Sequence, residues 1–99
     1  MRSAVVSDTS VLISLSNLGQ LDSLQHFFSE VLITPSVASE FGKRLPNFIT
    51  VTELVNQKNM LLLQQHLDDG EASAIALAVE RKIHSVLIDK KKAGCVARN

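Results

Sequence analysis

Short apolar runs alternate with longer amphipathic stretches along the chain, and this pattern predicts strands that alternate with helices. The first apolar run, residues 4–7, is followed directly by Asp8. Apolar residues then recur every three or four positions as far as Leu18. Such an arrangement is typical of a buried strand that leads into a helix. Gly19 marks the end of this helix, and residues 21–28 carry the pattern of a second, short helix.

The middle of the chain repeats the arrangement. Residues 31–33 predict a second strand. Thr34 can then cap a helix whose first position is Pro35, and this helix is expected to run to about Arg44. Residues 48–52 are short and rich in β-branched side chains, which predicts an edge strand.

The last part of the chain carries the clearest helical pattern. Leucine-rich residues 53–67 predict one helix, and residues 68–83, with apolar residues on one face, predict another. Residues 85–88 predict a buried strand that ends at Asp89, and residues 90–99 predict a terminal helix. Because strands and helices alternate, we expect parallel βαβ units and an α/β fold.

The composition indicates one small globular domain over residues 1–99. Of the 99 residues, 45% are hydrophobic and 20% are charged, and a domain takes roughly 100–150 residues. Cys95 is the single cysteine, so no disulfide can form within the chain. No apolar stretch reaches the roughly 20 residues of a membrane span. We therefore expect a cytoplasmic protein with no membrane partner.

Four carboxylates fall where a parallel sheet would bring them together. Asp8 and Asp89 each follow directly after a predicted strand. Glu40 lies on the helix after the second strand, and Glu71 lies in the first turn of the helix before the last strand. Ligands of open α/β sheets bind beyond the carboxyl ends of the strands. Clustered carboxylates repel unless a cation or a proton separates them, and oxygen ligands favour Mg²⁺ or Mn²⁺, ions that support phosphodiester hydrolysis.

Each acid also has a purely structural explanation when it is considered alone. Asp8 and Asp89 could cap the helices that follow them. Asp68 and Glu71 have the spacing of a capping box. Glu40 could pair with an arginine one helical turn further on. For any single acid these explanations are the commoner ones, so it is the joint placement of the four that favours a site.

Four blocks of the sequence resemble those of PIN domains. In chain order they are Val-Val-Ser-Asp-Thr-Ser at 5–10, Val-Leu-Ile-Thr-Pro-Ser-Val-Ala-Ser-Glu-Phe at 31–41, Asp-Asp-Gly-Glu-Ala-Ser-Ala-Ile-Ala-Leu-Ala at 68–78 and Val-Leu-Ile-Asp at 86–89. More narrowly, the chain is similar to bacterial and archaeal PIN-like proteins described as predicted nucleic-acid-binding proteins. One block would be a weak signal, but four in the right order are typical of the family.

The resemblance implies a three-layer α/β/α fold with a central parallel sheet and a metal-dependent ribonuclease site of the toxin–antitoxin kind. Asp8, Glu40, Glu71 and Asp89 match the acidic positions of the family, which implies that they are the catalytic residues and ligate Mg²⁺ or Mn²⁺. Ser10 matches a small polar residue that helps to hold the site. The implied partners are single-stranded RNA, an antitoxin protein and a second copy of the chain in a homodimer.

The formal net charge of zero hides two opposed segments. Residues 1–80 hold four basic and nine acidic residues, whereas residues 81–99 hold six basic residues and one acidic residue. A basic segment beside an acidic body is compatible with a phosphate-bearing substrate. Lys90, Lys91 and Lys92 could contact RNA phosphates, although so short a run is as often a solvated helix face.

The sequence departs from similar proteins after Asp89. They continue past the next helix with a further strand, a glycine-containing turn and a last helix, whereas this sequence stops at Asn99. We therefore expect a PIN-like domain that lacks its last strand and helix and has an open sheet edge. Two functions follow as hypotheses. One is a metal-dependent RNA endonuclease, and the other is a catalytically inactive, truncated PIN module that binds nucleic acid or a protein.

Overall fold

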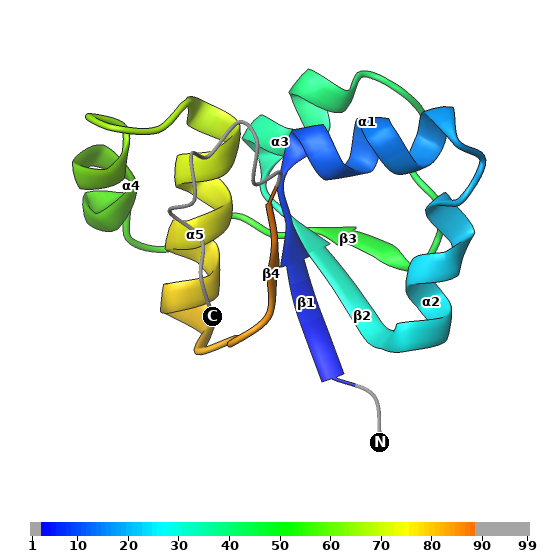
Figure 1. Cartoon of the computed structure of the whole chain (residues 1–99). Helices are drawn as coiled ribbons and strands as arrows, with labels where there is room; N and C mark the ends of the chain where they lie inside the picture. Colours follow the sequence, from blue (N-terminus) through cyan, green and yellow to red (C-terminus); the bar gives the residue numbers. More distant parts are fainter. Residues whose placement is uncertain (1–2, 89–99) are drawn as a thin grey trace.

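Four parallel strands form one sheet in the computed structural model, which describes residues 3–88. The strands are β1 (Ser3–Ser7), β2 (Phe28–Ile33), β3 (Ile49–Val51) and β4 (Val86–Leu87), and their order across the sheet is β3-β2-β1-β4. The central pair, β1 and β2, places Val5 beside Val31 and Val6 beside Leu32. The predicted α/β fold with a central parallel sheet is thus confirmed (Figure 1).

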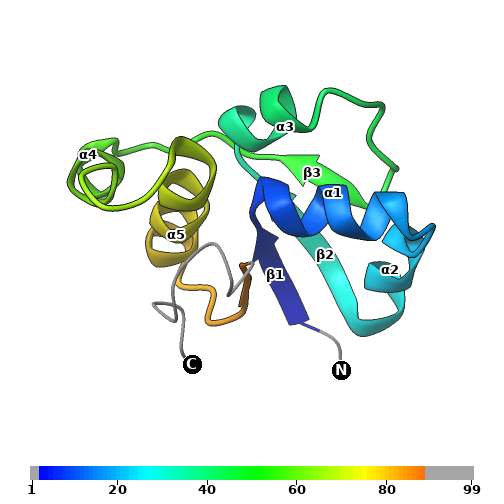
Figure 2. The same ribbon diagram turned by 45° about the horizontal axis from the view of Figure 1, so that its top comes forward.

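Helices make every connection between consecutive strands. Between β1 and β2 lie α1 (Thr9–Asn17), a 3-10 turn, η1 (Leu21–Ser23), and α2 (Leu24–Phe27). Between β2 and β3 lies α3 (Pro35–Phe41), and between β3 and β4 lie α4 (Lys58–Leu63) and α5 (Asp69–Arg81). In both views α4 lies outside α5, away from the sheet (Figures 1 and 2). Strand β3 is at the edge of the sheet, as its sequence predicts.

Successive residues of the central strands divide the core into two layers. Val5 packs with the helices α1, α2 and α3, whereas Val6 packs with α5. This follows from the strand geometry, in which successive side chains point to opposite faces. The first layer contains Val5, Leu12, Leu24, Val31, Ile33, Val37, Phe41 and Ile49. The second contains Val6, Leu32, Ala74, Leu77 and Ala78, and its alanines allow α5 to approach the sheet closely.

Local side-chain chemistry sets the start and the end of α3. Thr34 caps the helix as expected, because its Oγ1 accepts a hydrogen bond from the amide of Val37 at 3.2 Å. Pro35 occupies the first turn. The helix ends at Phe41, short of the expected residue 44, because Gly42 adopts the left-handed conformation with φ of 66°.

The helix expected over residues 53–67 is confined to Lys58–Leu63. A distant carboxylate explains the difference. Glu80 on α5 accepts hydrogen bonds from the amide of Val55 at 2.9 and 3.1 Å and from the amide of Asn56 at 2.9 Å. The Asn56 side chain in turn accepts a hydrogen bond, at 2.8 Å, from the amide of Lys58, the first residue of α4. These bonds hold the segment before α4 as a loop.

Other boundaries differ less from expectation. The strand expected at residues 85–88 is Val86–Leu87. The short helix expected at 21–28 gives way to β2 at Phe28. The terminal helix expected at residues 90–99 lies outside the described residues.

The bonds to Glu80 predict a pH-dependent contribution to stability. The amide of Asn56, followed by that of Val55, lowers the pKa of the Glu80 carboxyl below its ordinary value of 4.5. A carboxyl whose pKa is lowered in the folded state stabilises the fold above its unfolded-state pKa, and this contribution disappears as the pH falls through the folded-state pKa. We therefore expect Glu80→Gln to lower the melting temperature at about pH 7, by an amount that shrinks below pH 4.5.

The measurement is thermal unfolding, followed by circular dichroism, from about pH 7 to about pH 3. Glu30→Gln, at an exposed position of β2, is the matched control for the removal of one surface carboxylate. A Glu80→Gln difference that stays constant over the whole range would contradict the role of this carboxylate.

Candidate active site

The carboxyl ends of β1 and β4 lie side by side, and the first predicted acid follows one of them. Asp8 comes directly after β1, and its backbone amide donates a hydrogen bond to the carbonyl oxygen of Leu87, the last residue of β4, at 3.0 Å. The sheet therefore places Asp8 next to the strand that leads to Asp89. Asp89 itself, with Lys90, Lys91 and Lys92, lies outside the described residues.

Asp8 is buried and caps α1. The residue is 1% exposed, and its Oδ1 accepts a hydrogen bond from the amide of Val11 at 2.9 Å. The capping explanation is therefore correct for this acid. A carboxylate has about four acceptor positions on its two oxygens, so capping is compatible with a second role as a ligand. Ser10 lies half-buried in the first turn of the same helix.

Glu40, an exposed residue of α3, is bound to α1 and not to the arginine considered as its partner. The hydroxyl of Thr9 donates a hydrogen bond to Oε1 of Glu40 at 2.6 Å. Arg44 does not lie one helical turn beyond Glu40, because α3 ends at Phe41. Since Thr9 follows Asp8 directly, this bond brings the segments that carry two of the acids together.

The third acid lies on a segment that touches the same pair. Gly70 is so close to Glu40 that a Cβ on this glycine would lie 2.5 Å from Oε1 of Glu40 and 2.8 Å from Oγ1 of Thr9. Glu71, the next residue, is only 4% exposed, and its amide donates to Oδ1 of the capping Asp68 at 2.9 Å. The beginnings of α1 and α5 therefore meet at Glu40.

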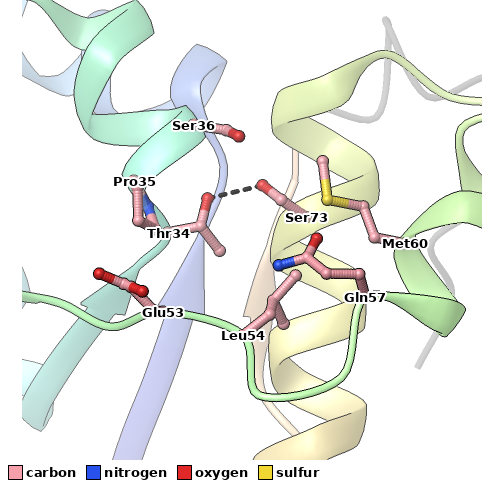
Figure 3. Close-up of a pocket in the computed structure, with 8 residues that line it drawn as sticks. All are labelled: Thr34, Pro35, Ser36, Glu53, Leu54, Gln57, Met60 and Ser73. Carbon is pink, nitrogen blue, oxygen red and sulfur yellow. Dashed lines mark hydrogen bonds between the residues drawn. The ribbon is translucent and has the colours of Figure 1, made fainter.

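A chain of buried hydrogen bonds also connects α3 and α5. Ser73 donates its only hydroxyl proton to the carbonyl oxygen of Gly70 at 3.0 Å. It must therefore accept the 2.6 Å hydrogen bond that joins it to the hydroxyl of Thr34, which makes Thr34 the donor (Figure 3). Thr34 in turn accepts from the amide of Val37. The chain runs from the first turn of α3 to the first turn of α5 without an unsatisfied hydroxyl.

Two pockets flank the first turn of α3. One, of about 160 Å³, is lined by the Thr34–Ser73 pair and by side chains of the loop and helix that precede α5, including Leu54, Gln57 and Met60 (Figure 3). The other, of about 400 Å³, is open and is lined by Pro35, Ser36, Ser39, Glu40 and Asp69. The open pocket gives solvent and ligands access to Glu40.

The acids do not form a complete metal site within the part of the chain that the structure describes. Among residues 3–88, no group of three or more His, Cys, Asp or Glu side chains is arranged to hold a metal ion. The fold thus brings together the segments that carry Asp8, Glu40 and Glu71, but it does not draw their carboxylates into a closed cluster.

The sequence does not indicate the residues that join the segments carrying Asp8, Glu40 and Glu71. Thr9, Gly70 and the pair Thr34–Ser73 carry the contacts between helices. One signal was available, because a glycine in the first turn of the clearest helix is unfavourable for helix formation. Its position between two acids could have indicated a close approach of another segment.

The comparison with protein families covers almost the whole chain. A family model described as PIN domain matches residues 4–99. The chain belongs to the PIN-domain family. Comparisons with curated proteins and with solved structures gave no match. For this PIN domain, family membership indicates a nuclease-type function and nucleic-acid binding in general terms. None of the helices within residues 3–88 is long and apolar enough to cross a membrane.

The hydrogen-bond chain between α3 and α5 predicts a marked effect of Thr34→Val on the stability of this PIN domain. The substitution removes the helix cap and leaves the Ser73 hydroxyl without its buried partner, and we expect a loss of about 1–3 kcal/mol in the free energy of unfolding. Thr34→Ser keeps the hydroxyl and is expected to retain most of this free energy.

Urea unfolding measures the effect. Thr50→Val is the matched control, because Thr50 is exposed on the edge strand β3, and it is expected to change the free energy of unfolding by no more than about 0.5 kcal/mol. Equal losses for Thr34→Val and Thr50→Val would show that the hydrogen-bond chain does not stabilise the protein.

Proposed function

We propose that this PIN domain is a metal-dependent RNA endonuclease in which Asp8, Glu40, Glu71 and Asp89 hold Mg²⁺ or Mn²⁺. The observation that carries the proposal is the convergence at Glu40. Thr9, next to Asp8, binds its carboxylate, and Gly70, next to Glu71, lies against it. Three acid-bearing segments therefore share one corner of the molecule, at the sheet edge where α/β proteins bind their ligands.

The chemistry of the side chains fits a hard divalent cation. All four are carboxylates, and oxygen ligands of this kind favour Mg²⁺ and Mn²⁺ over zinc. When bound, such an ion activates water and neutralises the charge that develops on a phosphodiester. The protein supplies the negative charges and orients two of them by hydrogen bonds. The Asp8 carboxylate accepts from the amide of Val11, and the Glu40 carboxylate accepts from the hydroxyl of Thr9.

The difference in exposure suggests how substrate reaches the site. Asp8 and Glu71 are almost completely buried, whereas Glu40 is exposed and lines the open pocket of about 400 Å³. An RNA phosphate that enters through this pocket would meet Glu40 first. Lys90, Lys91 and Lys92 are proposed as phosphate contacts, with Ser10 as a supporting residue.

The proposed biological setting follows the family resemblance. The substrate is single-stranded RNA, and the protein acts in the cytoplasm. It is the toxin of a toxin–antitoxin pair, it binds an antitoxin protein, and it forms a homodimer.

A second function has one observation in its favour. The carboxylates within residues 3–88 do not form a closed metal-binding group. This would suit a catalytically inactive PIN module that binds nucleic acid or a protein partner. Cleavage and binding assays on the same protein separate the two functions.

The proposed activity predicts that Asp8→Asn is folded but inactive. Asn caps helices about as well as Asp, so the variant keeps the cap on α1 while it loses the negative charge. We expect cleavage of single-stranded RNA in Mg²⁺ or Mn²⁺ to fall by a factor on the order of 100 or more, since even residues that only support a metal ligand cost about 10–100-fold when mutated. EDTA is expected to abolish cleavage by the wild type.

Asp22→Asn, at an exposed position in η1, is the matched control and should cleave like the wild type. Circular dichroism verifies that both variants are folded. Cleavage that survives Asp8→Asn or EDTA would overturn the endonuclease proposal. Binding of RNA without cleavage under all metal conditions would instead support the second function.

A further inference from the structure

The contact between Gly70 and Glu40 points to a role for two residues that carry no charge. We infer that Thr9 and Gly70 are positioning residues that together fix the carboxylate of Glu40. The hydroxyl of Thr9 binds Oε1, and the absent side chain at position 70 leaves the space that this oxygen occupies. The inference rests on the proposed function, in which Glu40 is a metal ligand.

The conformation of the backbone does not account for the glycine at position 70. Positive φ angles occur at Gly19 and Gly42, whereas Gly70 lies within the first turn of α5. Glycine is less favourable there than alanine, because it loses more conformational freedom when the helix forms. What an added Cβ would meet is the carboxylate of Glu40 at 2.5 Å and the hydroxyl of Thr9 at 2.8 Å. The glycine is therefore explained by this close approach.

Of the two groups that touch Gly70, the carboxylate is the one that can move. Thr9 is 8% exposed, lies at the start of α1 and has a β-branched side chain with few rotamers. Glu40 is exposed, and its carboxylate is at the end of a flexible side chain. A methyl group at position 70 would therefore displace the Glu40 carboxylate and break its bond to Thr9. It would also lie 2.8 Å from Oγ1 of Thr9, which has little freedom to move, so the first turns of α1 and α5 would have to separate slightly.

Fixing this side chain has a direct consequence for ligand binding. A solvent-exposed glutamate occupies many rotamers, and ordering it on binding costs conformational entropy. The bond to Thr9 and the space at Gly70 select one arrangement before any ligand arrives. A site held in this way binds more tightly than the same carboxylate on a mobile side chain.

The first part of the test uses the metal-free protein and measures melting temperatures. Gly70→Ala is expected to lower the melting temperature, because the clash with Thr9 and the loss of its bond to Glu40 outweigh the preference of the helix for alanine. Thr9→Val is expected to lower it in the wild-type background and to have no further effect in the Gly70→Ala background, where the bond is already broken. Thr9→Ser keeps the hydroxyl and should behave like the wild type. Additive effects of Gly70→Ala and Thr9→Val would overturn the inference.

The second part measures the dissociation constant of Mn²⁺ by electron paramagnetic resonance. We expect Gly70→Ala and Thr9→Val each to raise it about tenfold, which corresponds to about 1.4 kcal/mol. Thr9→Ser keeps the hydroxyl and should retain the wild-type Mn²⁺ dissociation constant. Thr50→Val on β3 serves as the control. An unchanged Mn²⁺ dissociation constant in both variants would overturn the positioning role. A wild-type protein that binds no Mn²⁺ would overturn the proposed function itself, and the melting temperatures would still decide whether Thr9 and Gly70 act together.

Discussion

The burial of both faces of β1 and β2 constrains the rest of the molecule. Val5 and Val6 are both fully buried, although they point into different layers of the core. Each face of the sheet therefore needs its own covering of helices. Parallel neighbours cannot be joined by a tight hairpin, so the chain crosses over through helices between consecutive strands. Such crossovers return every strand to the same direction, and the junctions that carry Asp8 and Thr34 consequently meet at one edge.

Two hydrogen bonds hold the short helix α3 at that edge, one near each of its ends. At the beginning, Thr34 binds Ser73 of α5. In the last turn, Glu40 binds Thr9 of α1. The helix is only seven residues long, too short to be stable by itself, and it depends on these contacts and on the packing of Val37 and Phe41. Its orientation and the position of Glu40 are therefore set by its neighbours.

The features that could be predicted from the sequence are those with a local cause. The caps at Thr34 and Asp68 were predictable because the capping residue and its partner amide lie within three positions. The alternation of strands and helices was predictable from the spacing of apolar residues. The four acids could be proposed as a group because parallel strands bring their ends together.

The features that escaped prediction depend on side chains distant in sequence. The start of α4 is set by Glu80, which lies 25 residues beyond Val55. The partner of Glu40 lies 31 residues before it, and spacing along a helix suggested a nearby arginine in its place. Neither pattern nor composition indicates which loop a distant carboxylate will reach. The closeness of Gly70 to Glu40 likewise exists only in three dimensions.

The first turn of α5 also affects the electrostatics of the acids that lie in it. Asp68 caps this helix, and Asp69 and Glu71 lie in its first turn. The aligned peptide dipoles of a helix place roughly half a positive charge at its N-terminus, and this stabilises nearby negative charges by about 0.3–1 kcal/mol each. With its 13 residues, α5 is the longest helix in the described part of the chain. The backbone of α5 thus provides a permanent partial positive charge next to Asp68, Asp69 and Glu71.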